Sequence, residues 1–248
     1  MKKGVSKYYS RFLSLSTMDK TLFDKIRAKT ITIVGVGGLG SIIAHQLTAL
    51  GIRNLRLIDT DIIEESNLQR QFLYRYTDIG RNKVDIAKQF LEKINPDVNV
   101  VAINKKITKQ TVSIVTKESN CVIDGLDNFE TRFLVNKQCL VSSVPFVFGA
   151  VNGISGNTTT IIPGETICLE CIFANIKGII APSIEETGIH PSILGIIGNI
   201  QVFEAIRIIC DQEPLLKNKL LFYDLGEMEL TKLTVQPKDD CICQKYKK

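Results

Sequence analysis

The sequence predicts an α/β fold built on a doubly wound, mostly parallel sheet that is extended by antiparallel strands. Three observations lead to this prediction. Strand-length apolar runs alternate with helix-like segments over the first 150 residues, a glycine-rich turn follows the first of these runs, and the pattern becomes strand-rich after residue 150. Strands that alternate with helices form a parallel sheet whose two faces are covered by those helices.

The elements of the first half follow from the spacing of apolar residues. Strand-length apolar runs occupy Ile31 to Val34, Leu55 to Ile58, Val98 to Ile103, Cys121 to Ile123 and Phe146 to Phe148. Apolar residues at helical spacing mark Ser41 to Leu50, Lys83 to Ile94 and Phe129 to Val141. We therefore expect five strands and three intervening helices in this half.

The second half has a different pattern. Its predicted elements are an extended strand from Gly153 to Ile162 before a Pro163-Gly164 turn, an irregular stretch from about Ala174 to Pro191, a strong helix from Ile193 to Ile209, and two strands, Lys219 to Tyr223 and Glu229 to Val235, with a turn at Gly226. We expect these strands to join the sheet of the first half, since no linker separates the two halves.

Composition excludes several classes of protein. The 248 residues are 44% hydrophobic and 23% charged, as in ordinary globular proteins, which excludes a disordered or fibrous chain. We find no apolar run of the roughly 20 residues that a membrane helix needs, and no apolar signal core near Met1. The net charge of +5 comes from scattered basic residues, so a nucleic-acid partner is not indicated. Seven mostly isolated cysteines indicate a reducing, cytoplasmic compartment.

The turn after the first strand indicates a Rossmann-like nucleotide site. It reads Gly-x-Gly-Gly-x-Gly, with Gly35, Gly37, Gly38 and Gly40, and a helix follows. Such glycines permit a tight turn, let a phosphate approach the backbone, and let the helix pack closely on the strand. Asp59 ends the second strand 19 positions after Gly40, where a carboxylate can accept hydrogen bonds from ribose. The turn alone does not distinguish a dinucleotide from ATP.

The residues after Asp59 favour a triphosphate. Asp61, Asn67, Arg70, Gln71 and Lys83 follow within one connection, and the lysine begins the next helix. An enzyme that cleaves ATP must neutralise charge on the α-phosphate and on departing pyrophosphate, and Arg and Lys do this. A dehydrogenase has no such need. Each of these residues could alternatively be part of an exposed polar face.

The fourth strand ends in Asp124-Gly125-Leu126-Asp127-Asn128, at the edge where open α/β sheets bind ligands. Asp127 is a plausible Mg²⁺ ligand beside the nucleotide, because Mg²⁺ prefers carboxylate and phosphate oxygens. The alternative is that Asp127 or Asn128 caps the helix that starts near Phe129. The two roles are compatible.

Taken together in this order, these motifs resemble the ThiF/MoeB/HesA family, which is related to the ubiquitin-activating enzymes. The resemblance covers nearly the whole chain. It includes the further segments Phe148-Gly149-Ala150, Pro163-Gly164-Glu165, Cys168-Leu169-Glu170-Cys171 and Gly195 to Ile206.

The resemblance implies an adenylyltransferase. Such enzymes use Mg-ATP to adenylate the C-terminal glycine carboxylate of a small ubiquitin-like sulfur-carrier protein that ends in Gly-Gly, and they release pyrophosphate. It also implies a homodimer in which an N-terminal arginine, here Arg11, reaches the partner's ATP site. The family's glutamine after that arginine is Phe12 in this chain. Arg70, Lys83 and Arg11 would then face phosphates, Asp59 the ribose, and Asp127 the Mg²⁺.

On this reading residues 1–248 form one domain of the family type. We expect an N-terminal helical arm at 1–28, a nucleotide-binding half at 29–150, and a carrier-binding half with a metal site at 151–248.

Four cysteines suggest a structural zinc site. Cys168 and Cys171 have the spacing of half a zinc knuckle, and the family places a second Cys-x-x-Cys near the C-terminus. Here that pair is Cys241 and Cys243, with one residue between them. Either both bind Zn²⁺, or Asp240 or water replaces a ligand, or zinc is weak or absent. The stretch from Pro182 to Gly188 lacks the cysteine of members that form a covalent sulfur link, which indicates adenylation only. The remaining cysteines, Cys121, Cys139 and Cys210, and the histidines His45 and His190, fit packing or surface positions.

Three alternative functions use part of the same pattern. A short peptide could replace the carrier as substrate. An NAD-dependent oxidoreductase would use Gly35 to Gly40 and Asp59 but would leave Arg70, Lys83 and Asp127 without a role. A non-catalytic subunit that binds a ubiquitin-like partner would have lost ATP residues that this chain keeps.

Overall fold

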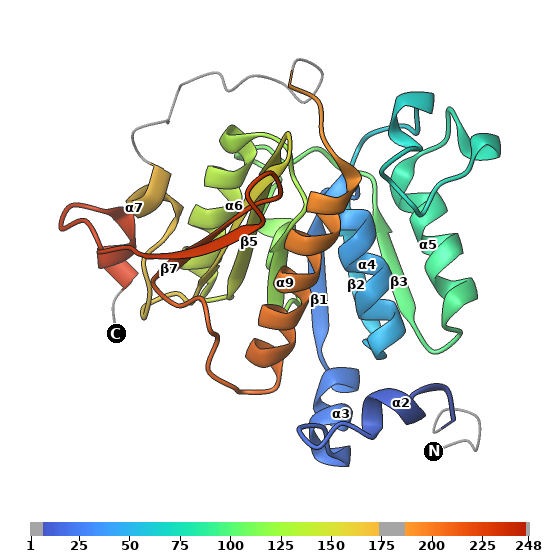
Figure 1. Cartoon of the computed structure of the whole chain (residues 1–248), viewed down its shortest axis with the longest axis horizontal. Coiled ribbons are helices and arrows are strands. Elements are labelled where there is room, and N and C mark those ends of the chain that lie inside the picture. The colour runs from blue at the N-terminus through green and yellow to red at the C-terminus, as the bar shows by residue number, and fades with distance from the viewer. Residues whose placement is uncertain (1–6, 174–186, 247–248) are drawn as a thin grey trace.

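In the computed structural model, which describes residues 7–173 and 187–246, one sheet of eight strands runs through both halves of the chain (Figure 1). Its spatial order is β3-β2-β1-β4-β5-β6-β7-β8. The strands are β1 Thr30–Val34, β2 Asn54–Ile58, β3 Asn99–Ile103, β4 Cys121–Asp124, β5 Phe146–Asn152, β6 Ser155–Ile161, β7 Lys219–Asp224 and β8 Glu229–Thr234.

Pairing in this sheet confirms the predicted fold class. β1 to β5 pair in parallel, and β5 to β8 pair antiparallel. The order reverses at β1, whose neighbours are β2 and β4. In open α/β sheets this reversal creates a crevice at the carboxyl ends of the strands.

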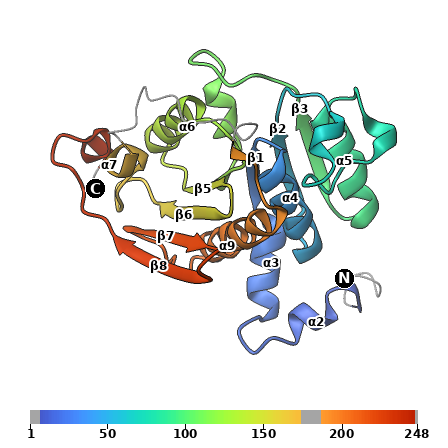
Figure 2. The same ribbon diagram turned by 45° about the horizontal axis from the view of Figure 1, so that its top comes forward.

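Helices cover both faces of the sheet (Figure 2). The helices are α2 Ser10–Leu13, α3 Lys20–Ala28, α4 Gly38–Leu50, α5 Lys83–Ile94, α6 Phe129–Ser142, α7 Leu169–Phe173 and α9 Pro191–Ile209, with short 3₁₀ turns η1 Glu65–Asn67, η2 Tyr76–Asp78, η3 Val112–Val115 and η5 Ile242–Tyr246. Buried residues of α4, α5 and α9 form one core with the sheet, and those of α6 and α7 form a second core on the other face.

Element boundaries differ from prediction in a few places. β5 continues to Asn152, beyond the expected end at Phe148, because every residue from Phe146 to Asn152 pairs with β6. Gly153, with φ +58°, lies in the turn between the two strands. α4 begins at Gly38 and not at Ser41, so two glycines of the turn already belong to the helix.

The start of α9 also differs from prediction. The helix begins at Pro191 because the Nδ1 atom of His190 accepts a hydrogen bond from the Ser192 amide, which caps it. The irregular stretch expected from Ala174 to Pro191 falls largely on residues 174–186, which lie outside the described residues.

One described helix, α9 with 19 residues, is long and apolar enough on average to cross a membrane, although it contains polar and charged residues. Its composition has a structural explanation, since half of it is buried and it packs against α4, β5 and β6. It also carries Glu204, which is buried and accepts hydrogen bonds from Thr160 Oγ1 at 2.6 Å and from the Leu216 amide at 3.0 Å. These bonds tie the helix to the antiparallel part of the sheet.

Three cysteines pack in the core, as expected. Cys121 and Cys139 are fully buried, and Cys210 is nearly so. Burial raises the pKa of the thiols of Cys121 and Cys139, so both remain protonated at neutral pH.

The described part of the N-terminal arm, α2 and α3, packs at the amino end of β1 (Figure 1). Tyr9 contacts the Phe23 ring at a centroid distance of 4.9 Å, and its hydroxyl accepts a hydrogen bond from Asn95 Nδ2 at 2.6 Å. Arg27 pairs with Asp97 at 2.9 Å. The arm is therefore fixed at the amino ends of the strands, whereas the glycine turn lies at their carboxyl ends.

Candidate active site

The candidate site lies where β1, β2 and β4 end side by side. Val34 pairs with Ile58 on one side and with Asp124 on the other. The ladder continues one residue further, because the Gly35 amide donates to Ile58 O and the Gly125 amide donates to Val34 O, each at 2.8 Å. The segments that follow these three strands carry most of the residues predicted from the sequence.

Three glycines allow the backbone segments to touch here. A Cβ atom on Gly40 would lie 1.9 Å from Gly35 O, and one on Gly125 would lie 2.4 Å from the same oxygen. Gly35 itself has φ +87°, which favours glycine. This contact brings the N-terminus of α4 onto the turn. Its N-cap, Gly37, has no side chain to accept a hydrogen bond, so the amides of the first helical turn are available to a phosphate.

Asp59 joins the glycine turn to the next connection. Its carboxylate accepts from the Val36 amide at 2.6 Å and from the Asp61 amide at 2.8 Å. Burial raises the pKa of Asp59 against the opposing effect of these two hydrogen bonds. A carboxylate has lone pairs for about four hydrogen bonds, so it can still accept from ribose hydroxyls.

Lys83 is the buried cation of the site. Its side chain is only 6% exposed, and its Nζ lies 2.8 Å from Asp61 Oδ2. The Lys83 amide also donates to Asp61 O at 3.0 Å. The exposed carboxylate of Asp61 therefore holds Lys83 in place and balances its charge when no phosphate is bound.

Gln71 and Tyr74 pack under the glycine turn. Gln71 is buried, its Nε2 lies 3.6 Å from where a Cβ on Gly37 would be, and its Oε1 has no hydrogen-bond partner within residues 7–173 and 187–246. The Tyr74 hydroxyl donates to Val36 O at 2.7 Å, and burial raises its pKa well above the usual value. Both side chains thus support the position of residues 36 and 37.

Asn67 and Arg70 have local partners in the same connection. Asn67 Oδ1 accepts from the Glu64 amide at 3.2 Å, and Arg70 Nη1 donates to Ser66 O at 2.7 Å. These contacts shape the turn η1. Arg70 stays half-exposed, which leaves its guanidinium accessible to solvent.

Of the two candidates for the helix cap after β4, the structure uses Asn128. Asn128 is the N-cap of α6, and its Oδ1 accepts from the Thr131 amide at 2.9 Å. Asp127 takes no part in the cap. It is exposed, and its Oδ1 accepts from Asn128 Nδ2 at 3.2 Å. Asp127 is therefore free to bind a cation at the same edge as the glycine turn.

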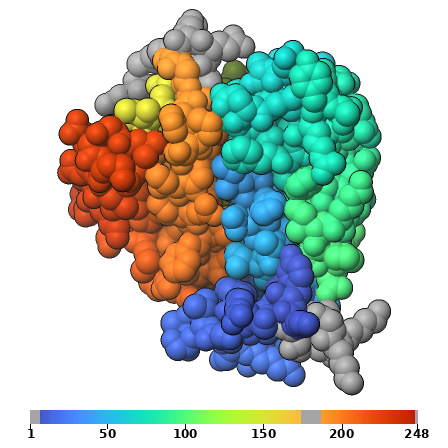
Figure 3. All heavy atoms as spheres, turned by 45° about the vertical axis from the view of Figure 1, so that its right-hand side comes forward, coloured from blue at the N-terminus to red at the C-terminus, as the bar shows by residue number. Residues whose placement is uncertain are grey.

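Arg11 is the predicted site residue that the structure does not bring to this edge. It is exposed on α2, and the arm that contains α2 lies at the opposite end of the molecule (Figure 3). In Figure 3 the arm lies at one end of a face of the molecule and the connection after β2 lies at the other end. Helices α4 and α9 form the surface between them. Arg11 could therefore reach an ATP site only in another copy of the chain.

Sequence reasoning missed the side chains that support the loop after β4. Asp124 is fully buried and pairs with Arg132 at 2.9 Å, and the Gln201 amide donates to Asp124 O at 2.8 Å. Burial raises the pKa of Asp124, and the charge of Arg132 opposes this shift. A carboxylate that ends an otherwise apolar strand was the available signal, because such a group needs a buried partner.

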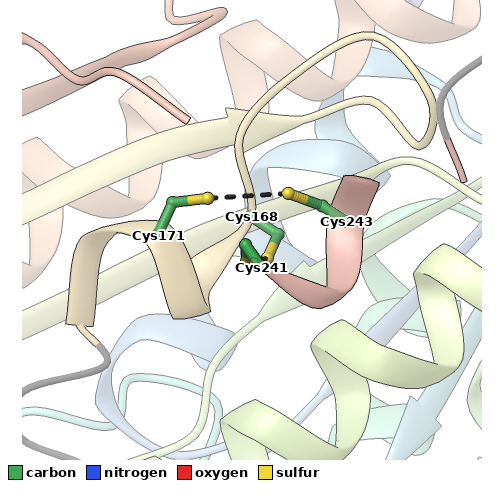
Figure 4. Close-up of side chains that lie close together, drawn as sticks. All are labelled: Cys168, Cys171, Cys241 and Cys243. Carbon is green, nitrogen blue, oxygen red and sulfur yellow. Dashed lines mark hydrogen bonds between the residues drawn. The ribbon is translucent and has the colours of Figure 1, made fainter. Parts of the chain in front are cut away.

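The four predicted zinc ligands form one cluster (Figure 4). Their sulfur atoms lie within 4.8 Å of one another, and the pairs Cys168–Cys241 and Cys171–Cys243 are 3.5 Å apart. Tetrahedral zinc with bonds of about 2.3 Å requires sulfurs about 3.8 Å apart, so the donor set fits this ion. Of the alternatives from sequence, the arrangement matches the one in which both Cys241 and Cys243 are ligands, while Asp240 is exposed.

Comparison with known proteins finds similar sequences and structures over nearly the whole chain. A model of the ThiF family matches residues 9–244. The SAMP-activating enzyme E1 of Haloferax volcanii is 33% identical over 94% of this chain and 86% of its own length. The molybdopterin-synthase adenylyltransferase of Escherichia coli is 29% identical over 94% of each chain. The structure of E. coli MccB with SeMet MccA has a TM-score of 0.83 and 25% identity, and covers 96% of this chain and 74% of that one.

Proposed function

The chain belongs to the ThiF family, and on that premise we propose that it adenylates the C-terminal glycine carboxylate of a small ubiquitin-like sulfur-carrier protein, using Mg-ATP and releasing pyrophosphate. Its relatives include adenylyltransferases of sulfur-carrier proteins, and the chain is an adenylyltransferase. The main observation that favours ATP over NAD is the buried Lys83. It directly follows the connection after β2, which packs against the glycine turn. Hydride transfer develops no charge on a cleaved phosphate for this cation to balance.

The reaction requires no nucleophile from the enzyme. A carboxylate oxygen of the carrier attacks the α-phosphorus of ATP, the new O–P bond gives an acyl-adenylate (a mixed anhydride), and the P–O bond to pyrophosphate breaks. The chain's task is to align the two groups and to balance the charge that develops. In our proposal Gly35, Gly37, Gly38 and Gly40 admit the phosphates, Asp59 accepts from ribose, and Asn67 and Gln71 line the same pocket. Arg70 and Lys83 lie on the phosphate side.

Asp127 is the proposed Mg²⁺ ligand, with Asn128 orienting its carboxylate. The fit rests on an exposed carboxylate that accepts one side-chain hydrogen bond and directly follows Gly125 and Leu126, whose backbone lies against Gly35 of the glycine turn. When bound, Mg²⁺ would neutralise charge on the phosphates.

One exposed apolar face supports a protein substrate. Leu220 and Leu233 lie opposite each other on β7 and β8, and Phe222 shares their face. Gly156 faces Ile197 of α9 and pairs with Tyr223, so Tyr223 points toward α9 as well. Phe222, the neighbouring residue of β7, therefore points to the opposite face. Phe222 is 37% exposed and Leu233 is 51% exposed. We propose that the globular part of the carrier covers these residues, while its tail follows the carboxyl edge toward Asp127.

We further propose a homodimer in which Arg11 of one copy faces the ATP phosphates of the other. The position of Arg11, exposed and far from the site of its own chain, supports this arrangement. The dimer would complete each site with one further cationic side chain, from outside the chain that holds Asp127. The free state of the seven cysteines supports a reducing compartment, the cytoplasm, for this enzyme.

The cysteine cluster is proposed to hold one structural Zn²⁺, which would fasten the C-terminal segment to α7. All four donors come from the protein, which leaves no open position for catalysis. We expect purified protein to contain one zinc per chain, and Cys171→Ser to lose it and to reduce the free energy of unfolding by about 3 kcal/mol. Metal analysis and urea unfolding measure both effects. Cys210→Ser is the matched control, because Cys210 is equally buried outside the cluster. If Cys171→Ser keeps a full equivalent of zinc, the assignment is wrong.

A short peptide is the second candidate substrate, and the similarity to E. coli MccB, solved with SeMet MccA, favours it. The active-site residues would keep the same roles, because the reacting group is again a C-terminal carboxylate. Binding of an intact carrier would use the apolar face of β7 and β8, whereas binding of a short peptide would not need it.

ATP–pyrophosphate exchange tests the proposal. Purified protein with Mg²⁺ is assayed alone, with small carriers that end in Gly-Gly, and with the isolated C-terminal peptides of those carriers. We expect exchange only with an intact carrier. Exchange with the peptide alone would support the second candidate. Binding of NADH together with no ATP binding would contradict both.

A further inference from the structure

The parallel strands β4 and β5 separate just below the candidate active site. Their last paired residues are Ile123 and Val147, and β5 then continues beside β6 only. Separation leaves backbone groups of both strands without a strand partner. Such groups are costly when buried, so side chains must satisfy them.

Arg132 of α6 bridges this split from one face of the sheet. Its Nε donates to Asp124 Oδ2 at 2.9 Å, and its Nη2 donates to Gly149 O at 3.1 Å and to Leu126 O. Asp124 Oδ1 accepts from the Leu126 amide at 2.9 Å. The ion pair therefore holds both backbone polar groups of Leu126, the residue before Asp127.

Gln201 of α9 bridges the same split from the other face. Its Nε2 donates to Asp124 O at 2.8 Å and to Val147 O at 3.3 Å. Gly149 leaves space for this amide, since a Cβ there would lie 2.4 Å from it. Helices on opposite faces thus fix the end of β4 relative to β5.

Arg132 cannot contact a substrate directly. It is 4% exposed, its charge is balanced by Asp124, and its guanidinium lies 5.1 Å from the centre of the Phe129 ring and 5.4 Å from that of Phe148. Asp127, in contrast, is exposed and lies between two fixed points, Leu126 and the helix cap Asn128. The position of the Asp127 carboxylate is therefore set by its neighbours.

We propose that Arg132, with Asp124, is a positioning residue for adenylation: it holds the loop of Asp127 in the geometry that binds the divalent cation, and it keeps that loop in register with β5. This inference rests on the proposed function. Residues that orient a ligating carboxylate typically contribute about 10- to 100-fold to metal affinity or to activity.

The test compares Arg132→Lys with Arg27→Lys. Arg27 is the matched control: it is also buried and ion-paired, with its guanidinium over two aromatic rings, but it lies at the amino end of the sheet. Mn²⁺ binding to the folded protein in the presence of a non-hydrolysable ATP analogue is measured by electron paramagnetic resonance, beside thermal unfolding and pyrophosphate exchange. Asp124→Asn is the second variant, should Arg132→Lys fail to fold.

We expect Arg132→Lys to weaken Mn²⁺ binding by at least about tenfold, and to lower kcat of exchange by a similar factor. Arg27→Lys is expected to lose stability without a change in Mn²⁺ affinity, and Asp124→Asn to act in the direction of Arg132→Lys. Unchanged Mn²⁺ affinity in a folded Arg132 or Asp124 variant would overturn the inference. Absence of exchange in the wild-type protein would instead contradict the proposed function.

Discussion

Asp127→Ala is expected to abolish adenylation and to leave the fold intact. Pyrophosphate exchange should fall at least about 10³-fold, because the substitution removes the proposed metal ligand at the point where charge develops. The fold should survive, since Asp127 is exposed and its described side-chain hydrogen bond is with its neighbour Asn128. Exchange assays and thermal unfolding of the same preparation measure the two effects.

Glu130→Ala is the control for this substitution, because Glu130 is another exposed carboxylate three residues further on, in the first turn of α6. It should keep near-normal exchange. Mixing Asp127→Ala with Arg11→Ala protein is informative as well. If Arg11 acts across a dimer, a complete site combines Asp127 of one copy with Arg11 of the other. In an equal mixture about half of the dimers contain both variants, and each of these has one complete site, so about a quarter of the activity should return. Normal turnover by Asp127→Ala alone would contradict the role of this residue.

Gly40→Ala is expected to destabilise the protein and to eliminate ATP binding. The new Cβ would lie 1.9 Å from Gly35 O, a backbone atom that the turn holds in place. Relief requires α4 to move away from β1, which should cost about 3 kcal/mol of unfolding free energy and distort the phosphate-binding turn. Chemical unfolding and calorimetric titration with ATP measure the two losses.

Gly195→Ala is the matched control in another helix. Gly195 lies in α9, and a Cβ there would meet no atom of the described residues within 4 Å. Alanine has the higher helix propensity, so this variant should be as stable as the wild type or up to about 1 kcal/mol more stable. A Gly40→Ala protein that binds ATP with wild-type affinity would show that the close contact is not needed.

The order of elements was predictable because each parallel strand is a short apolar run between longer helical patterns. Ile31 to Val34 and Leu55 to Ile58 match the strands β1 and β2 within one residue. The boundary at Asn152 was not predictable. Gly149 to Asn152 lack a strong apolar alternation, and they are extended because β6 pairs with them. The division into domains stays a prediction.

The candidate site was predictable where function depends on local sequence. The glycine spacing, Asp59 and Lys83 lie within connections that the chain order brings to one edge of the sheet. Arg132 and Gln201 could not be identified in this way, because they bind carbonyl groups 17 and 77 residues away that only tertiary folding supplies. The cysteines were found from their spacing, but only the structure shows that a single residue between Cys241 and Cys243 still lets both thiols join the cluster.

Direct isolation of the acyl-adenylate is the measurement that tests the central claim most directly. The protein, Mg²⁺, ATP labelled at the α-phosphate and a carrier ending in Gly-Gly are mixed, quenched in acid and analysed by mass spectrometry. Our account predicts a carrier that has gained one AMP, located on its C-terminal glycine, with an equal amount of pyrophosphate. An AMP group on the enzyme or on a carrier side chain would contradict it, and so would the absence of any adenylate with carriers and peptides when ATP is bound.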